Sequence, residues 1–193
     1  ATPIRLAIKA GDIDFRAENQ AKAWAEDYKV PAVEKGWLKK ELMPHRMPTG
    51  MQAFVMNARR ARFSDARVRE ALGLAFDFEW TNRNLFNGQY TRTASFFSNS
   101  DLASSGVASG QELAILERFR PKVPDGVFGE AYAPSVTDGS GWSRANLRRA
   151  TALLQEAGWV VKDLKLVNGA SGEPFRFEIL LVSPAFERVV LPY

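Results

Sequence analysis

The sequence contains no cysteine and a single histidine, His45. The absence of cysteine excludes disulfides, thiolate metal sites and cysteine nucleophiles, but it does not identify a compartment. A metal site would have to add carboxylates to His45. A serine–histidine–carboxylate triad would have to use the same histidine, and no GxSxG motif is present to support it. We therefore expect no metal and no cofactor.

Several other signatures are also missing. No apolar run approaches the roughly 18 residues that a membrane-spanning helix needs. The N-terminus lacks the basic–apolar–small pattern of a signal peptide, so the chain is cytosolic, a mature secreted protein or a piece of a longer one. No GxGxxG follows a predicted strand, and no GxxxxGK[ST] occurs. The net charge of +4 arises from 26 basic and 22 acidic side chains that are scattered along the chain, which argues against nucleic acid as a partner.

The composition is that of an ordinary globular protein. Hydrophobic residues make up 46% of the 193 residues and charged residues 25%, values that argue against disorder. A chain of this length can bury a core, either as one domain or as parts of two.

One stretch, residues 63–90, predicts two short helices in succession. Asp65 and Asp77 are suited to cap their N-termini, because a carboxylate there accepts from free backbone amides. In the first helix, apolar residues recur at helical spacing from Val68 to Phe76, which indicates a face that packs on a core. Gly88 is placed to end the second helix. This stretch is scaffold and carries no chemistry.

Periodicity and turn residues predict the other elements. Helices are expected over residues 2–10, 18–27, 111–119, 143–157 and after Ser183, and strands over residues 12–16, 37–46, 51–57, 160–168 and 175–182. Residues 91–110 are rich in Ser, Asn and Gly and predict a long loop, which is usually functional or mobile. Phe96 and Phe97 in this loop either serve function or attach the loop to the core.

The segments FSDARVREAL (63–72) and AFDFE (75–79) resemble the pattern F-x-D-x-R-V-R-x-A-L-x-x-A-x-D-x-E. This pattern is typical of oligopeptide- and dipeptide-binding proteins of ABC transporters, family 5 of the extracellular solute-binding proteins. NLRRATALLQEAGW (146–159) resembles a later helix of the same family. GDIDFRAEN, PTGMQAFVMN and NLFNGQYTRTASFFSNSDLASSG are similar to its Yej-type subgroup. Phe78, where most of the wider family has arginine or lysine, also favours that subgroup.

The resemblance implies an α/β chain that is a fragment of a two-lobed periplasmic binding protein, class II-like, with mixed sheets and flanking helices. Residues 1–50 would end the first lobe, residues 51–62 would form a crossover strand and hinge, and residues 63–193 would form the first half of the second lobe. The last predicted helix has little more than two turns, which also suggests a segment of a longer bacterial protein whose signal peptide lies outside it.

The function that this resemblance implies is transport rather than catalysis. The protein would capture a peptide or peptide-like solute between its lobes and deliver it to the membrane permease of an ABC transporter, as a periplasmic monomer. We expect ligand contacts from Asn57, Tyr90, Ser95 and Phe96, and from Arg16 and Glu18 of the first lobe, although each of these six can also be structural.

Two other classes of function stay open. The long Ser- and Gly-rich loop could make a protein contact in an interaction module without transport. The acidic residues could include a carboxylate pair of a hydrolase, although no spacing supports one. A permease gene beside the parent gene would favour transport, and recovery of an intact ligand would argue against hydrolysis.

Overall fold

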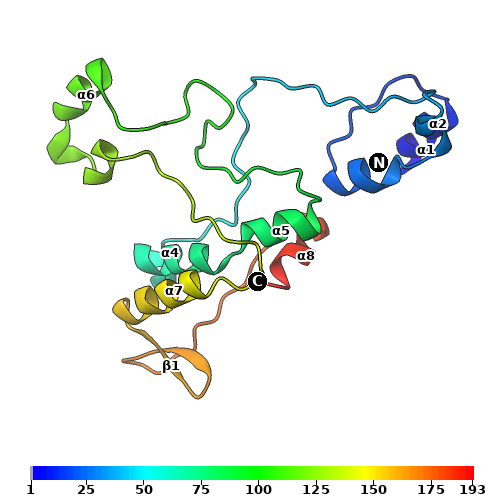
Figure 1. Ribbon diagram of the computed structural model, residues 1–193. Coiled ribbons are helices and arrows are strands. Elements are labelled where there is room, and N and C mark those ends of the chain that lie inside the picture. Colours follow the sequence, from blue (N-terminus) through cyan, green and yellow to red (C-terminus); the bar gives the residue numbers. More distant parts are fainter. Residues whose placement is uncertain (1) are drawn as a thin grey trace. The chain divides into compact units, whose positions relative to one another are not determined.

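The computed structural model describes residues 2–193, and its internal contacts divide the chain into two compact units. The first unit comprises Ala1–Met43, Met56–Tyr90 and Val136–Tyr193, and the second comprises Pro44–Val55 and Thr91–Ser135. Figure 1 shows helices joined by long irregular segments, with one small antiparallel sheet in the described part of the chain. The expected α/β class is thereby confirmed. Within residues 2–193 no helix has the length and the apolar character needed to cross a membrane.

The N-terminal part of the first unit is helical. Helix α1 (Thr2–Ala10) ends where Gly11 takes a φ of +83°, a left-handed conformation that glycine adopts without steric cost. The π-helical turn η1 (Ala23–Asp27) stands within the predicted second helix, and the single-turn α2 (Pro31–Glu34) follows it. The strand predicted over residues 12–16 is wrong, because these residues pair with no other strand of the described chain.

Two capped helices form in the predicted stretch. The short α3 (Ala61–Ser64) leads into α4 (Ala66–Ala75), whose first turn is capped by Asp65 through a 2.8 Å hydrogen bond from Arg67 N–H. Asp77 caps α5 (Phe78–Leu85) by accepting from Trp80 N–H, also at 2.8 Å. Both predicted caps are confirmed, and each satisfies an amide that the helix leaves free.

Helix α7 (Arg144–Glu156) packs along α4, and the two helices lie side by side in Figure 1. Ala71 of α4 faces Ala150 and Leu153 of α7, and all three are buried. A second cluster joins Val68 to Phe63 and Trp159. Two alanines at the contact permit a close approach of the helices, and the larger side chains fill the volume on either side.

A β-hairpin follows α7 and Gly158. Strands β1 (Trp159–Lys162) and β2 (Lys165–Asn168) pair antiparallel, with Trp159 opposite Asn168 and Lys162 opposite Lys165. The two turn residues, Asp163 and Leu164, have φ of 50° and 61°, the left-handed values typical of a tight hairpin turn. The single strand predicted over residues 160–168 is therefore wrong, since a hairpin turn interrupts it.

Three further predicted strands are also wrong: residues 37–46, 51–57 and 175–182 have no strand pairing in the described chain. The last of them instead supplies Phe175 and Phe177 to an aromatic cluster. The Phe175 ring meets Trp159 edge-on at 4.7 Å, and the Phe177 ring lies 5.4 Å from Phe63. Such tilted contacts are favourable for aromatic rings. After them come η4 (Pro184–Phe186) and α8 (Glu187–Val190), where the predicted helix begins at its Ser183 cap.

The second unit is held by polar contacts rather than by a core. It contains α6 (Gly110–Glu117), the single turns η2 (Arg120–Lys122) and η3 (Asp125–Phe128), and the predicted long loop. The Asn99 amide nitrogen donates to the carbonyls of His45 and Met47, each at 2.9 Å. None of residues 44–55 and 91–135, all of which the structure describes, is buried.

We expect a polypeptide of residues 1–193 expressed alone to be cut by trypsin first in the second unit. Segments without buried apolar contacts open locally at low free-energy cost, so Arg118 should be cleaved before Arg149 of α7. Limited proteolysis with mass spectrometry of the early fragments measures this order. Equal resistance at the two arginines would contradict the expectation.

Candidate ligand-binding site

Two of the six predicted site residues, Arg16 and Glu18, lie together in a buried polar network. The Glu18 side chain is only 2% exposed. Its carboxylate accepts from Arg16 Nη2 at 3.1 Å, from the Tyr28 hydroxyl at 3.1 Å and from Gln20 N–H at 3.1 Å. Arg5 Nε lies 3.9 Å from the same carboxylate. One buried carboxylate therefore ties α1 and the following segments together.

The network favours the ionised form of Glu18. Burial alone would raise the pKa of Glu18, but the hydrogen bonds from Arg16, Gln20 and Tyr28 outweigh it and hold that pKa below its ordinary value. Burial raises the pKa of Tyr28, and the hydrogen bond that its hydroxyl donates to Glu18 adds to this effect. Tyr28 is thus a neutral donor to a charged acceptor, the stronger kind of hydrogen bond.

The other predicted residues of the first unit are Asn57 and Tyr90. The Asn57 side-chain oxygen accepts from Arg59 N–H at 3.1 Å, which closes a local turn. Tyr90 exchanges two hydrogen bonds with the Asn82 side chain, at 3.0 Å and 2.7 Å, and its ring lies 4.6 Å from Phe86. Tyr90 keeps 42% of its surface exposed. The backbone of Tyr90 is therefore fixed while its ring stays accessible.

Ser95 and Phe96 belong to the second unit. The Ser95 hydroxyl accepts from Phe97 N–H at 3.1 Å, and its carbonyl accepts from the Ser98 hydroxyl at 2.9 Å. These bonds form a compact turn that presents the Phe96 ring, which is 75% exposed. Neither Phe96 nor Phe97 is buried within its unit, so attachment to a core there does not account for the two rings.

A pocket of about 400 Å³ lies in the first unit, where the end of α4, the start of α5, residues 137–143 and α8 meet. The Asp77 side chain connects the start of α5 to the loop of residues 137–143. Its carboxylate accepts from Trp80 N–H at 2.8 Å and from Gly141 N–H at 2.9 Å, and the Thr137 hydroxyl lies against it. Gly141, at φ +83°, lies so close to Trp80 that a Cβ there would stand 3.0 Å from the ring. This contact could not be predicted from the sequence, because Asp77 and Gly141 are far apart in the chain.

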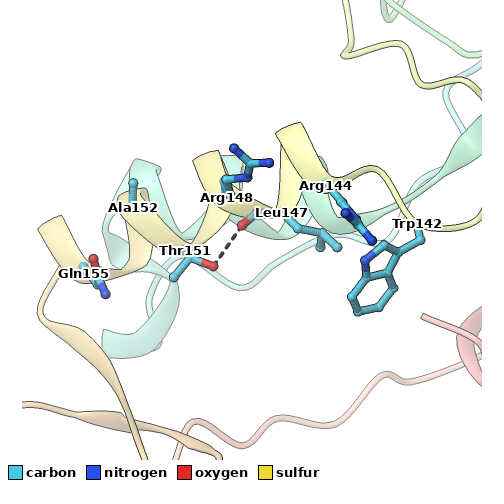
Figure 2. Close-up of a pocket in the computed structure, with 7 residues that line it drawn as sticks. All are labelled: Trp142, Arg144, Leu147, Arg148, Thr151, Ala152 and Gln155. Atoms are coloured by element: carbon cyan, nitrogen blue, oxygen red, sulfur yellow. Dashed lines mark hydrogen bonds between the residues drawn. The ribbon is translucent and has the colours of Figure 1, made fainter.

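The outer face of α7 carries a second hollow, an open groove of about 440 Å³ (Figure 2). Trp142, Arg144, Leu147, Arg148, Thr151, Ala152 and Gln155 line it. Figure 2 shows the Thr151 hydroxyl bonded to the carbonyl of Leu147, at 2.8 Å, one turn earlier in the helix. Sequence reasoning missed this groove, because the exposed face of an amphipathic helix gives no signal of its own.

No residues of the described chain form a metal centre. Among residues 2–193, no group of three or more histidine, aspartate or glutamate side chains is placed to hold an ion. The arrangement offers exposed aromatic rings and hydrogen-bonding groups, which suit non-covalent binding of a ligand.

We expect Glu18→Ala to lower the free energy of unfolding by about 2 kcal/mol, because Arg16 and Tyr28 lose a buried charged partner. The control is Glu26→Ala: its pairing with Lys22, at 4.0 Å and half exposed, should contribute under about 0.5 kcal/mol. Urea unfolding measures both changes in the free energy of unfolding.

The stability that Glu18 contributes should also depend on pH. Because folding lowers the pKa of Glu18 from 4.5, this contribution is complete above that pH and is lost as the pH falls below it. A Glu18→Gln variant that keeps the full acid dependence would contradict this.

We expect Asp77→Ala to lower the free energy of unfolding by about 2 kcal/mol, since it removes a helix cap and a second bond to the loop at Gly141. The matched control is Glu70→Ala on the exposed side of α4, which should change stability little. Thermal unfolding measures both variants. Equal unfolding midpoints for the Asp77→Ala and Glu70→Ala variants would show that other contacts hold the loop.

Comparison with known proteins identifies the family of this chain. The model of the bacterial extracellular solute-binding proteins, family 5 (middle part), matches residues 1–189. The chain is 46% identical to the uncharacterized protein y4wM of Sinorhizobium fredii over 97% of its own length. In Agrobacterium fabrum it is 43% identical to the probable peptide-binding protein YejA and 40% identical to the peptidoglycan-binding protein YepA, again over 97% of its length.

The chain spans less than a third of the length of each of these relatives: 28% of y4wM, 31% of YejA and 32% of YepA. The resemblance to the Yej-type subgroup is confirmed by these relatives. The family model covers nearly the whole chain, so the conclusion is direct: the chain is a member of family 5 of the bacterial extracellular solute-binding proteins.

Proposed function

We propose that the protein is the substrate-binding component of an ABC transporter and that it captures a peptide or peptide-like solute. The observation that carries this proposal is the family match over residues 1–189, together with the relative that is named a probable peptide-binding protein. No catalytic step is proposed, since recognition and release are sufficient for this role.

The proposed mechanism is closure of two lobes on the ligand. Residues 1–50 would belong to the first lobe, residues 51–62 to the hinge, and residues 63–193 to the second lobe. A ligand that touches both lobes only in the closed state stabilises that state, and the population shifts by the difference in affinity. The closed protein would act in the periplasm as a monomer and present its ligand to the permease.

The proposed ligand contacts are the six residues that the sequence predicted. Phe96 and Tyr90 offer exposed aromatic surface, and Asn57 and Ser95, each in a local turn, offer hydrogen-bonding groups. Arg16 and Glu18 enter the proposal as a pair, in which the buried carboxylate orients the guanidinium. Aromatic walls with few fixed polar groups suit peptides of varied sequence.

A second ligand class follows from the relative named a peptidoglycan-binding protein, which is 40% identical to the chain. Peptidoglycan contains short peptides, so the two relatives' names are compatible with one kind of site. Peptides released from peptidoglycan should therefore be titrated beside ordinary peptides.

Calorimetric titration of the whole protein with short peptides tests the proposal, and we expect measurable heat with at least one peptide pool. Phe96→Ala should weaken binding about tenfold, because an exposed aromatic contact is lost. Leu102→Ala is the control, since Leu102 is similarly exposed (70%) in the same unit and should leave affinity unchanged. No heat with any peptide or peptidoglycan pool would refute the proposal.

A further inference from the structure

The longer segment of the second unit, residues 91–135, leaves the first unit after Tyr90 and returns to it at Val136. We call Tyr90 the first root of this segment and residues 136–139 its second root. Both roots belong to the first unit. Side chains of α5 and of its Asp77 cap bind the chain at both roots.

The chain reverses its direction directly after α5, which brings the first root back to the helix. Asn87 and Gly88 both take left-handed conformations, with φ of 56° and 69°. Asparagine and glycine adopt such values most readily. Gly88 N–H also donates to the carbonyl of Asn82 at 2.8 Å. Tyr90 therefore lies beside Asn82, although eight positions separate the two in the sequence.

The Asn82 side chain binds both polar groups of the Tyr90 backbone. Its oxygen accepts from Tyr90 N–H at 3.0 Å, and its nitrogen donates to the Tyr90 carbonyl at 2.7 Å. Two paired residues of antiparallel strands exchange hydrogen bonds in the same way. Because two bonds at one residue fix its orientation as well as its position, Asn82 sets the direction of the backbone at the first root.

Thr137 is held in the second root by the start of the same helix. Thr137 N–H donates to the Glu79 carboxylate at 3.1 Å, and the Thr137 hydroxyl lies 2.9 Å from that carboxylate and against Asp77. Hydrogen bonds to an ionised carboxylate are stronger than those between neutral groups. Further along α5, Arg83 Nη1 donates to the carbonyl of Gly139 at 3.2 Å. The second root is thus bound to α5 at two successive places.

The restraint at the roots matters because the segment between them has no core. None of residues 91–135 is buried, so little inside the segment limits its motion. Asn82 and Glu79 stand three residues apart on α5, about 4.5 Å along the helix axis. A chain whose two ends are held at one place samples fewer conformations than a chain with a free end.

We propose that Asn82 and Thr137 are positioning residues for ligand binding. They hold the two roots so that the segment after Tyr90 keeps the conformation that receives the solute. The inference rests on the proposed function, in which Tyr90, Ser95 and Phe96 contact the ligand, and it adds two residues that act through these three. When only a fraction of the free protein is competent to bind, the apparent affinity falls by that fraction. Release of either root lowers the competent fraction.

Hydrogen exchange of the full-length protein without ligand tests the first root. Asn82→Ala should speed exchange of the backbone amides of residues 90–103 at least about threefold and leave α7 unchanged, because local opening becomes easier. Asn84→Ala is the matched control. Asn84 lies on the same helix, but its side chain donates to the Trp80 carbonyl, at 2.8 Å, within α5 itself. The control should exchange as the wild type does.

The second root is tested in the same way with Thr137→Val, which removes the hydroxyl and keeps the shape of the side chain. Exchange of the amides of residues 129–137 should become faster. The matched control is Thr151→Val, because the Thr151 hydroxyl bonds to the Leu147 carbonyl, at 2.8 Å, within α7. Equal exchange in the two variants would contradict a restraint at Thr137.

Stopped-flow kinetics tests the consequence for binding, with the short peptide that gives the largest calorimetric heat with the wild type as the probe. Asn82→Ala and Thr137→Val should slow association about three- to tenfold and leave dissociation unchanged, since fewer free molecules are competent. Loss of a direct ligand contact acts mainly on dissociation. Faster dissociation with unchanged association would therefore overturn the positioning role.

These outcomes separate the two proposals. A wild type that binds no peptide refutes the transport proposal and a role in ligand binding with it, while the exchange measurement still decides whether α5 restrains the segment. A wild type that binds peptide, with variants that exchange and associate as it does, refutes the positioning role alone. Equal acceleration of exchange in α7 would show general destabilisation of the first unit and would also overturn the inference.

Discussion

The contact between α4 and α7 is the interaction around which the hydrophobic core of the first unit is built. Ala71 and Ala150 allow the two helices to approach closely, and Val68 and Leu153 are almost wholly buried beside them. This packing places the C-terminus of α4 beside the Asp77 cap and turns the outer face of α7 to solvent. Burial of these side chains supplies stability at a place where no ligand group is needed.

The sequence predicted those parts of the fold that depend on local chemistry. The Asp65 and Asp77 caps, the end of α1 at Gly11 and the extent of α7 follow from residues within a few positions of each other. Strands failed because an extended segment needs a partner, and pairing is not local. Residues 51–57 have strand composition but no pairing in the described chain, which spans less than a third of its relatives.

The candidate site shows the same limit. Arg16 and Glu18 could be connected from the sequence, because they lie two residues apart. The buried state of Glu18 could not, since it depends on Tyr28 and Arg5 folding back over it. The hydrogen bond from Gly141 N–H to Asp77 was missed for the same reason, because 64 residues separate the two. The groove beside Trp142 was missed for a different one: it lies on the exposed face of a single helix, which gives no signal of its own.

The second unit has no buried residue to stabilise it. Its exposed rings, among them Phe96 and Phe97, bury little surface there, and its hydrogen bonds run mainly within turns. Hydrogen bonds of this kind contribute only about 1 kcal/mol each, similar to the cost of ordering one residue. Further apolar burial would stabilise the unit. A ligand that covers Phe96 would supply part of it, so binding and ordering of this loop would reinforce each other.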